Sequence, residues 1–204
     1  MDAKTHWENL YSTRAPEAVS WYRAHLEASL ALTARTGVTL SAPIIDIGAG
    51  ESTFVDDLLL RGYENISVLD ISQTAIEVTK KRLGPAAQQV RWLEGDILKM
   101  DLEPQAYDLW HDRAVFHFLT TPAQRIAYVR QVARAVRISG HVIVCTFGPE
   151  GPTKCAGLEV MRYDSESLHG EFGARFRLVE SSKELHQTPF GTTQQFLHCY
   201  CRLD

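Results

Sequence analysis

A regular alternation of short apolar runs with helical stretches, between residues 43 and 147, constrains the fold of this chain more than any other feature. The five runs that read as strands are "PIIDIG", "NISVLDI", "QVRWLEGD", "AYDLWHD" and "HVIVCTF". Gly62 and Gly84 stand where two helical stretches should end, and Thr121 followed by Pro122 suits the start of a third. Because strands that alternate with helices usually pair in parallel, the pattern predicts an α/β fold with helices on both faces of a parallel sheet.

The two ends of the chain depart from this alternation. Apolar residues at helical spacing around "EAVSWYRAHLEASLALTAR" predict a helical segment over residues 1–43. Near the other end "ESLHGEFG" reads as a short helix, and "RFRLVESSKELHQT" and "TTQQFLHCYCRLD" read as strands. The connection "PFG" between these two strands is short enough to permit only an antiparallel pair. We therefore expect one domain whose sheet ends in an antiparallel hairpin.

Charge and composition exclude several classes of partner. The chain has 204 residues, a net charge of −4 and no long run of Lys or Arg, so we expect no nucleic-acid partner. The N-terminus is polar and acidic and does not resemble a secretory or transit peptide. All apolar runs fall well short of the ~20 residues that a membrane span needs. We expect a cytoplasmic protein, monomeric or homodimeric, without a membrane partner.

The four cysteines are Cys145, Cys155, Cys199 and Cys201. In a cytoplasmic chain they should be reduced, and the absence of a C-x-x-C pair argues against a structural zinc site. Cys199 and Cys201, two residues apart on a predicted strand, should share a face, with Cys145 on a neighbouring strand. A soft-metal or metalloid site is one interpretation, but core packing is the favoured one, and we predict no metal.

The stretch "IIDIGAGES" ends the first strand of the alternation and carries Gly48 and Gly50. Open α/β sheets bind ligands at the carboxyl ends of their strands, and glycine lets the backbone approach a ligand closely. A dinucleotide fingerprint would need a third glycine at position 53, where this chain has Thr53. Only 57 residues (204 − 147) follow the fifth strand, which is too few for the substrate domain of a dehydrogenase. The turn therefore favours a ligand other than a dinucleotide.

The same stretch resembles the first motif of the class I S-adenosylmethionine-dependent methyltransferase family, with Ser52 where that family often has a third glycine. "LEGDI" resembles the family's adenine motif, "YDLWHD" its fourth motif, and "ARAVRISGHVIV" the turn before its fifth strand, with Ser139 replacing a glycine. The resemblance implies a Rossmann-like, seven-stranded, mostly parallel sheet with a C-terminal antiparallel hairpin. It divides one domain, 1–204, into a helical N-terminal lid (1–43), a cofactor-binding half (44–147), and a substrate loop with the hairpin (148–204).

By this resemblance the chain binds S-adenosylmethionine and releases S-adenosylhomocysteine. Asp70, 24 residues after Asp46 (70 − 46), matches the acid that takes both ribose hydroxyls, and one carboxylate can accept from two hydroxyls. Asp96 matches the acceptor of the adenine amino group, and Ile97 the residue that lines the ring. The predicted cofactor-binding residues are Asp46, Gly48, Ala49, Gly50, Asp70, Ile71, Asp96, Ile97, His111, Trp7 and Tyr11.

The methyl acceptor has to be inferred from three segments, because methyl transfer mainly requires alignment and a base only for a protonated nucleophile. In this family the N-terminal segment often closes over the cofactor, and the loop after the fourth strand faces the methyl group. Ordinary packing explains the aromatic residues equally well and explains His117 better. The candidates are Trp7, Tyr11, Trp21 and Tyr22 near the N-terminus, His111, Asp112, Arg113 and His117 after the fourth strand, and Lys154, Cys155 and Arg162 after the fifth.

The tail adds one further candidate. "KELHQTPFGTTQQF" resembles the C-terminal hairpin of small tellurite-resistance methyltransferases, which implies that His186 lies near the substrate. The match is partial, because Gln187 stands where an arginine is expected. The substrate-positioning candidates are therefore His111, Arg113 and His186, and no general base is identified.

Three functions remain open at this point. The favoured one is methyl transfer to a small-molecule acceptor, such as a thiol, a chalcogen oxyanion or another small metabolite. The second is a protein (lysine) methyltransferase, because "HWENLY" and "EAVSWY" resemble the N-terminal segment of some small members of that class. The third is a protein that binds S-adenosylmethionine without turnover.

Overall fold

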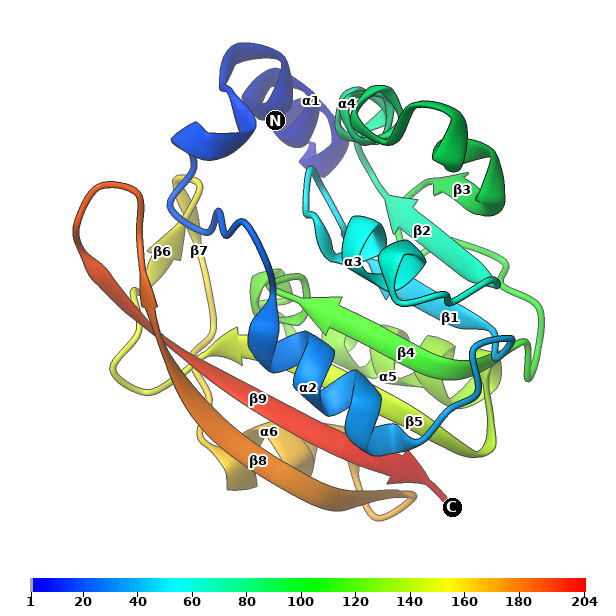
Figure 1. Ribbon diagram of the computed structural model, residues 1–204. Coiled ribbons are helices and arrows are strands. Elements are labelled where there is room, and N and C mark those ends of the chain that lie inside the picture. The colour runs from blue at the N-terminus through cyan, green and yellow to red at the C-terminus, as the bar shows by residue number, and fades with distance from the viewer. Residues whose placement is uncertain (1) are drawn as a thin grey trace.

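A computed structural model describes residues 2–204, and a seven-stranded sheet lies at its centre (Figure 1). The strand order is β3-β2-β1-β4-β5-β9-β8. The neighbours from β3 to β5 pair in parallel, whereas β9 runs antiparallel to both β5 and β8. The predicted parallel sheet and C-terminal antiparallel hairpin are confirmed. The strands of this sheet are β1 (Ile44–Ile47), β2 (Ile66–Asp70), β3 (Val90–Glu94), β4 (Tyr107–Arg113), β5 (Val136–Phe147), β8 (Phe176–Gln187) and β9 (Thr193–Leu203).

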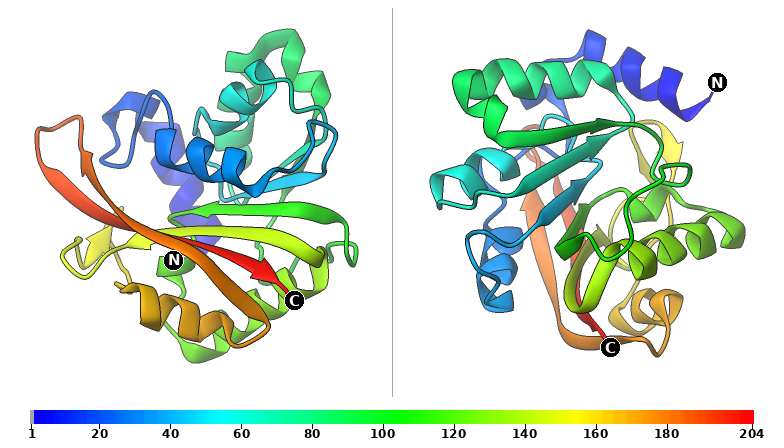
Figure 2. Two further views of the ribbon diagram at one scale, coloured as in Figure 1. Left: turned by 60° about the horizontal axis from the view of Figure 1, so that its bottom comes forward. Right: turned by 90° about the vertical axis from the view of Figure 1, so that its right-hand side faces the viewer.

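Helices cover both faces of the sheet, as predicted (Figures 1 and 2). The face toward the viewer in Figure 1 carries α2 (Glu27–Thr36) and α3 (Phe54–Leu60), with α4 (Gln73–Leu83) beside them. The opposite face carries α5 (Pro122–Ala135) and α6 (Ser165–Phe172). The remaining elements are α1 (Ala3–Thr13), η1 (Pro16–Ala18), η2 (Gly84–Gln89), η3 (Phe116–Phe118), β6 (Lys154–Cys155) and β7 (Leu158–Glu159).

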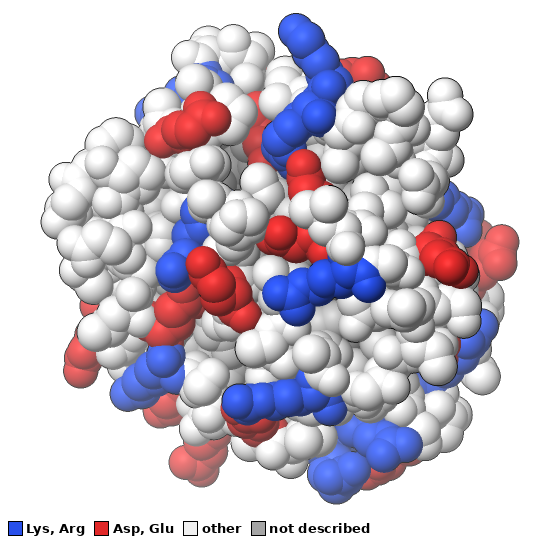
Figure 3. All heavy atoms as spheres, in the orientation of Figure 1, with Lys and Arg blue, Asp and Glu red and all other residues white. Residues whose placement is uncertain are grey.

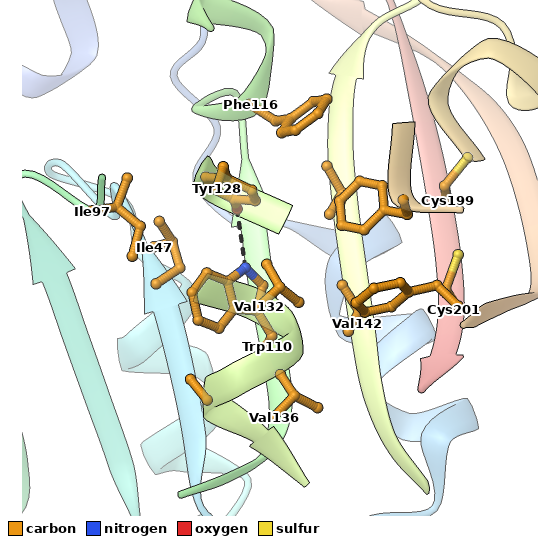
Figure 4. Packing of buried hydrophobic residues seen from close by; sticks show 14 of the residues in the cluster. Ile47, Ile97, Trp110, Phe116, Tyr128, Val132, Val136, Val142, Cys199 and Cys201 are labelled. Atoms are coloured by element: carbon orange, nitrogen blue, oxygen red, sulfur yellow. Dashed lines mark hydrogen bonds between the residues drawn. The ribbon is translucent and has the colours of Figure 1, made fainter. Parts of the chain in front are cut away.

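Two apolar layers follow from the alternation of side chains along the strands. In β1, Ile44 belongs to the cluster under α2 and α3, while Ile45 belongs to the cluster under α5 and α6. Figure 4 shows the second cluster, where the indole N–H of Trp110 donates to the Tyr128 hydroxyl at 3.0 Å. That bond satisfies a polar group that the core would otherwise leave unpaired.

Local sequence explains where the helices begin and end. Thr121 accepts from the N–H of Gln124, and the Gln124 side chain accepts from the N–H of Thr121, so α5 starts in a capping box. Gly62 follows α3 with φ of 84°, the left-handed conformation that favours glycine. These predicted boundaries agree with the structure.

The prediction of continuous helix over residues 1–43 was wrong for part of that segment. Residues 19–26 are not helical and lie between η1 and α2. Their backbone carbonyls accept from side chains elsewhere: Ser20 from His186 at 2.7 Å, Trp21 from Arg113 at 3.1 Å, and Ala24 from Thr53 at 2.8 Å. These tertiary hydrogen bonds replace the bonds within a helix, so the helical spacing of the apolar residues does not decide the local structure.

The cysteines were predicted only in part. Cys199 and Cys201 share one face of β9 and lie in the same apolar cluster (Figure 4). Cys145 points to the other face, where its sulfur lies 3.5 Å from His198 Nε2, so it is not beside them as expected. All four cysteines are free and buried, and within residues 2–204 no group of three or more His, Cys, Asp or Glu is arranged to hold a metal.

Surface charge and helix length bear on possible partners. Across residues 2–204, none of the helices combines the length and apolar character that a membrane span requires. On the face seen in Figure 3, Lys and Arg are interspersed with Asp and Glu and form no continuous basic stripe. That face therefore lacks the pattern that follows a phosphate backbone.

Candidate functional site

A cavity of about 430 Å³ lies where β1, β2 and β4 end. Its floor is the loops that follow these strands, and it also reaches the β3 end, β6 and β7. Residues 3–26, which we call the cover, line the cavity with several side chains and run along this edge of the sheet in Figure 1. The volume falls within the ~300–1,000 Å³ usual for small-molecule sites.

The glycine turn after β1 forms part of the floor. Gly48 has φ of 59° and Gly50 has φ of 54°, both in the left-handed region. A Cβ at Gly48 would collide with the Val115 side chain, and one at Gly50 would collide with the Tyr11 hydroxyl. The turn therefore needs glycine for its backbone conformation and for the close approach of its neighbours.

Asp70 ends β2 and is held by two backbone N–H groups. Gly50 donates to Oδ2 at 2.7 Å and Ser72 donates to Oδ1 at 2.8 Å. Burial raises the pKa of Asp70 to about 6, although both N–H groups favour the ionised form. Each carboxylate oxygen keeps a second lone pair, so Asp70, which lines the cavity, can still accept from a ligand.

Asp46 and His111 form a buried pair on adjacent strands. His111 Nδ1 donates to Asp46 Oδ1 at 2.7 Å, and its Nε2 shares a hydrogen bond with the Ser29 hydroxyl at 2.8 Å. Both ring nitrogens are therefore bonded within the protein. Asp46 Oδ2 is buried without a hydrogen-bond partner among the described residues. His111 thus fixes Asp46 in place, and the cavity presents a carboxylate oxygen that lacks a donor.

Asp96 and Ile97 follow β3 and line the cavity beside Ile71. Asp96 Oδ1 accepts from the N–H of Leu98 at 3.0 Å, and Oδ2 lies 3.2 Å from Lys99 Nζ. Ile97 is buried and contributes an apolar surface. The structure therefore brings together an acid and an apolar side chain, which suit a heterocycle that carries an amino group.

Glu51 is a cavity residue that the sequence analysis missed. It lines the cavity, is 8% exposed, and has both carboxylate oxygens buried without a partner in residues 2–204. Burial raises the pKa of Glu51 to about 7, against the opposing effect of Arg82. An acid within the turn "GAGES" was the available sign. We call Asp46, Glu51, Asp70 and Asp96 the acidic wall.

Arg113 also lines the cavity and ends β4, the strand beside β1. Its Nη1 donates to the Trp21 carbonyl at 3.1 Å, and its Cζ lies 4.7 Å from the centre of the Phe196 ring. Nη2 is buried and has no hydrogen-bond partner within the described chain. The adjacent Asp112 shapes this loop, because its carboxylate accepts from the N–H groups of Val115 and Phe116.

Aromatic rings surround Trp7, which also lines the cavity. The ring centre of Trp7 lies 5.2 Å from that of Phe118 and 6.2 Å from that of Trp21, both nearly perpendicular to it. Tyr11 stacks on Trp7 at 5.8 Å. Of these, Phe118 was not singled out from the sequence. We call Arg113, Trp7, Trp21, Phe118 and Cys155, all of which line the cavity, the arginine wall.

Several predicted candidates lie outside this cavity. His186 is buried and donates from Nε2 to the Ser20 carbonyl, so it holds the cover and does not line the cavity. His117 packs against Phe147, and burial lowers its pKa to about 3. Lys154 pairs with Glu159 at the surface. The other candidates that line the cavity are Gly48, Ala49, Ile71 and Tyr22, whereas Gly50 contributes through its bond to Asp70.

Comparison with known proteins identifies the domain. The family model of a methyltransferase domain matches residues 44–140, which contain the glycine turn, Asp70, Asp96 and β4. A solved structure from work on the conversion of a disulfide bond into a thioacetal group during echinomycin biosynthesis is similar in fold. Its TM-score is 0.81 at 16% identity, over 100% of this chain and 93% of that one.

Two curated relatives differ in what they methylate. The eEF1A lysine and N-terminal methyltransferase of Mus musculus is 25% identical over 138 residues, or 68% of this chain. The malonyl-[acyl-carrier protein] O-methyltransferase of Anoxybacillus flavithermus is 35% identical over 107 residues, or 52% of this chain. The chain spans 19% of the length of the first relative and 39% of the second.

Proposed function

Because residues 44–140 match the family model of a methyltransferase domain, we propose that the chain is a class I S-adenosylmethionine-dependent methyltransferase that transfers the methyl group to a small-molecule acceptor. The observation that carries this proposal is the enclosure of the cavity. Side chains of the cover line it together with the glycine turn, so that the acidic wall and the arginine wall border one shared space of about 430 Å³. A space of this size lies within the range of small-molecule sites.

The residues of the acidic wall fit the cofactor. S-adenosylmethionine carries ribose hydroxyls, an adenine amino group and an ammonium group, all of which donate hydrogen bonds. Asp70 and Asp96 suit the hydroxyls and the adenine amino group, and the unpartnered Oδ2 of Asp46 suits the ammonium group. Gly48 and Gly50 give the turn after β1 its left-handed backbone conformation at the floor of the cavity. Trp7 and Tyr11 of the cover lie over the site and exclude water.

Bound S-adenosylmethionine supplies a methyl group on a sulfonium, which is already activated for displacement. The task left to the protein is to hold the acceptor atom in line and close. Asp46, fixed by His111, and Asp70, fixed by two backbone N–H groups, form a rigid cradle on one side. Arg113, held by the Trp21 carbonyl and the Phe196 ring, offers a positioned cation on the other side.

Cofactor binding tests the first part of the proposal. Calorimetry should detect micromolar binding of S-adenosylmethionine and S-adenosylhomocysteine. Asp70→Ala should weaken both by at least tenfold, because a charged hydrogen-bond acceptor is worth on the order of 1.5–3 kcal/mol. Asp101→Ala is the matched control, since Asp101 is exposed and pairs with Arg134 outside the cavity. If Asp70→Ala leaves the affinity for both compounds unchanged, the cavity serves another ligand.

Methylation of a protein side chain is the second candidate, and the eEF1A methyltransferase relatives favour it. A labelling experiment separates the two. The protein is incubated with cell lysate and S-adenosylmethionine labelled on its methyl group, and the products are divided by mass. We expect label in low-mass products that depends on Asp70. Label confined to proteins would favour the second candidate instead.

A further inference from the structure

We propose that the methyl acceptor carries an acidic group, a carboxylate or similar oxyanion, which binds the Arg113 guanidinium, and a planar apolar body that lies along Trp7, Trp21 and Phe118. This inference rests on the proposed function and names the class of its acceptor. It concerns the arginine wall, which borders the same cavity as the acidic wall and shares Trp7 with the cover over the cofactor.

The first support is that one end of the Arg113 guanidinium lacks a hydrogen-bond partner within the described residues. In the described part of the chain, Arg113 forms no ion pair, and its hydrogen bond goes to one backbone carbonyl, that of Trp21. Its Nη2 is buried with no partner there. A guanidinium in a partly closed cavity is stabilised best by a planar anion that accepts from two N–H groups at once.

The second support is that the neighbouring acid, Glu184, already pairs with other residues. Glu184 is close enough to Arg113 to interact electrostatically with it. Its carboxylate, however, forms an ion pair with Arg23 and accepts from His198 Nε2 at 2.7 Å. Arg23 also lies 3.3 Å from Glu27. The charge of Arg113 therefore remains available for a ligand.

The third support is the shape of the wall. The Phe196 ring and the Trp21 carbonyl hold the guanidinium from two sides, so its plane is set before a ligand arrives. Next to it, Trp7 and Phe118 meet edge to face with ring centres 5.2 Å apart. Aromatic rings in this arrangement favour a flat apolar partner.

Charge separation across the cavity agrees with this assignment. The acidic wall suits the positively charged cofactor and would repel an acidic acceptor, whereas Arg113 attracts one. An acidic acceptor is thereby oriented with its charged group away from the acidic wall. An amine acceptor would meet a like charge at Arg113 instead.

The test compares matched acids and amides as ligands. The protein is loaded with S-adenosylhomocysteine, and ligand-observed NMR measures binding of benzoate, 2-naphthoate and indole-3-carboxylate and of their three amides. We expect at least one acid to bind tenfold more tightly than its amide. In Arg113→Gln the ratio should fall below twofold, and Arg113→Lys should keep part of it. Arg35→Gln, a surface arginine paired with Glu180, should leave the ratio unchanged.

The outcomes separate this inference from the proposed function. If S-adenosylhomocysteine does not bind the wild type, the proposed function fails first. If it binds with equal affinity to wild type and Arg113→Gln, the cofactor side is intact, and the acid-to-amide ratio alone decides. Acids that bind no better than their amides in the wild type, or a ratio that survives Arg113→Gln, would overturn the acidic-acceptor assignment. Thermal unfolding of both arginine variants checks that they fold.

Discussion

The acidic wall and the arginine wall line one cavity, yet they are built in different ways. Asp46 and Asp70 lie within strands, and Glu51 and Asp96 lie in the loops that follow strands, so the sheet fixes the positions of these acids. The arginine wall takes single side chains from the cover, from the β4 loop and from β6, which lie far apart in sequence. One wall is set by local order along the chain, and the other exists only after the tertiary structure has formed.

This contrast explains which features could be predicted from the sequence. Asp70 and Asp96 were predicted because each is an acid at the end of a predicted strand and matches a motif of the methyltransferase family, and the alternation of strands and helices predicted the sheet. Phe118 was missed because nothing near it in sequence indicates that it meets Trp7 of the cover. Residues 19–26 were misassigned because the bonds that hold them in a non-helical path come from residues such as Arg113 and His186.

The most severe way to break the acidic wall is to place a side chain in the glycine turn. Gly50→Ala adds a Cβ at a φ of 54° and directs it at the Tyr11 hydroxyl, so the turn and the cover must separate. We expect S-adenosylhomocysteine to bind at least 100-fold more weakly by calorimetry, or about 2.7 kcal/mol. Gly170→Ala is the control, because a Cβ at that position would meet no atom within 4 Å and its φ is not positive. Unchanged affinity in Gly50→Ala would show that the turn is not part of the site.

Glu51 allows a more specific test. Its ionised carboxylate should strengthen binding of the cationic cofactor but lower the stability of the ligand-free protein. In the folded protein the pKa of Glu51 is about 7, compared with 4.5 for an ordinary glutamate. Burial therefore favours its protonated form in the ligand-free protein. Its contribution to the free energy of unfolding is therefore fully present below pH 4.5 and lost as pH rises through 7. Glu51→Gln should unfold at a higher temperature than wild type at pH 8, by roughly 2–4 °C for each kcal/mol.

The same substitution should weaken binding of the cationic cofactor. In the wild type, the affinity for S-adenosylmethionine should rise between about pH 6 and 8 as Glu51 ionises. Glu51→Gln should bind about tenfold more weakly at pH 8, since it lacks the carboxylate charge, and should lose this part of the pH dependence. A variant that is stabilised without loss of affinity would place Glu51 outside the cofactor's reach.

The smallest predicted effect concerns the arginine wall alone. Phe118→Ala removes a ring that packs against Trp7 and lines the cavity. Once an acceptor is known, its KM should rise about fivefold, and S-adenosylhomocysteine affinity should change by less than about twofold, since an aromatic contact is worth roughly 1 kcal/mol. Equal losses on both sides would show that the two walls do not act separately.

The bond between Arg113 and the Trp21 carbonyl has a consequence for the order of events in a catalytic cycle. The guanidinium is aligned only while the cover lies across the cavity, and the cover rests on the glycine turn through Tyr11. The cofactor lies beneath the cover and must enter while the cover is open, whereas the acceptor meets an aligned arginine only once the cover has closed. We therefore expect ordered addition, with the cofactor first, and turnover paced by reopening of the cover to let the demethylated cofactor leave.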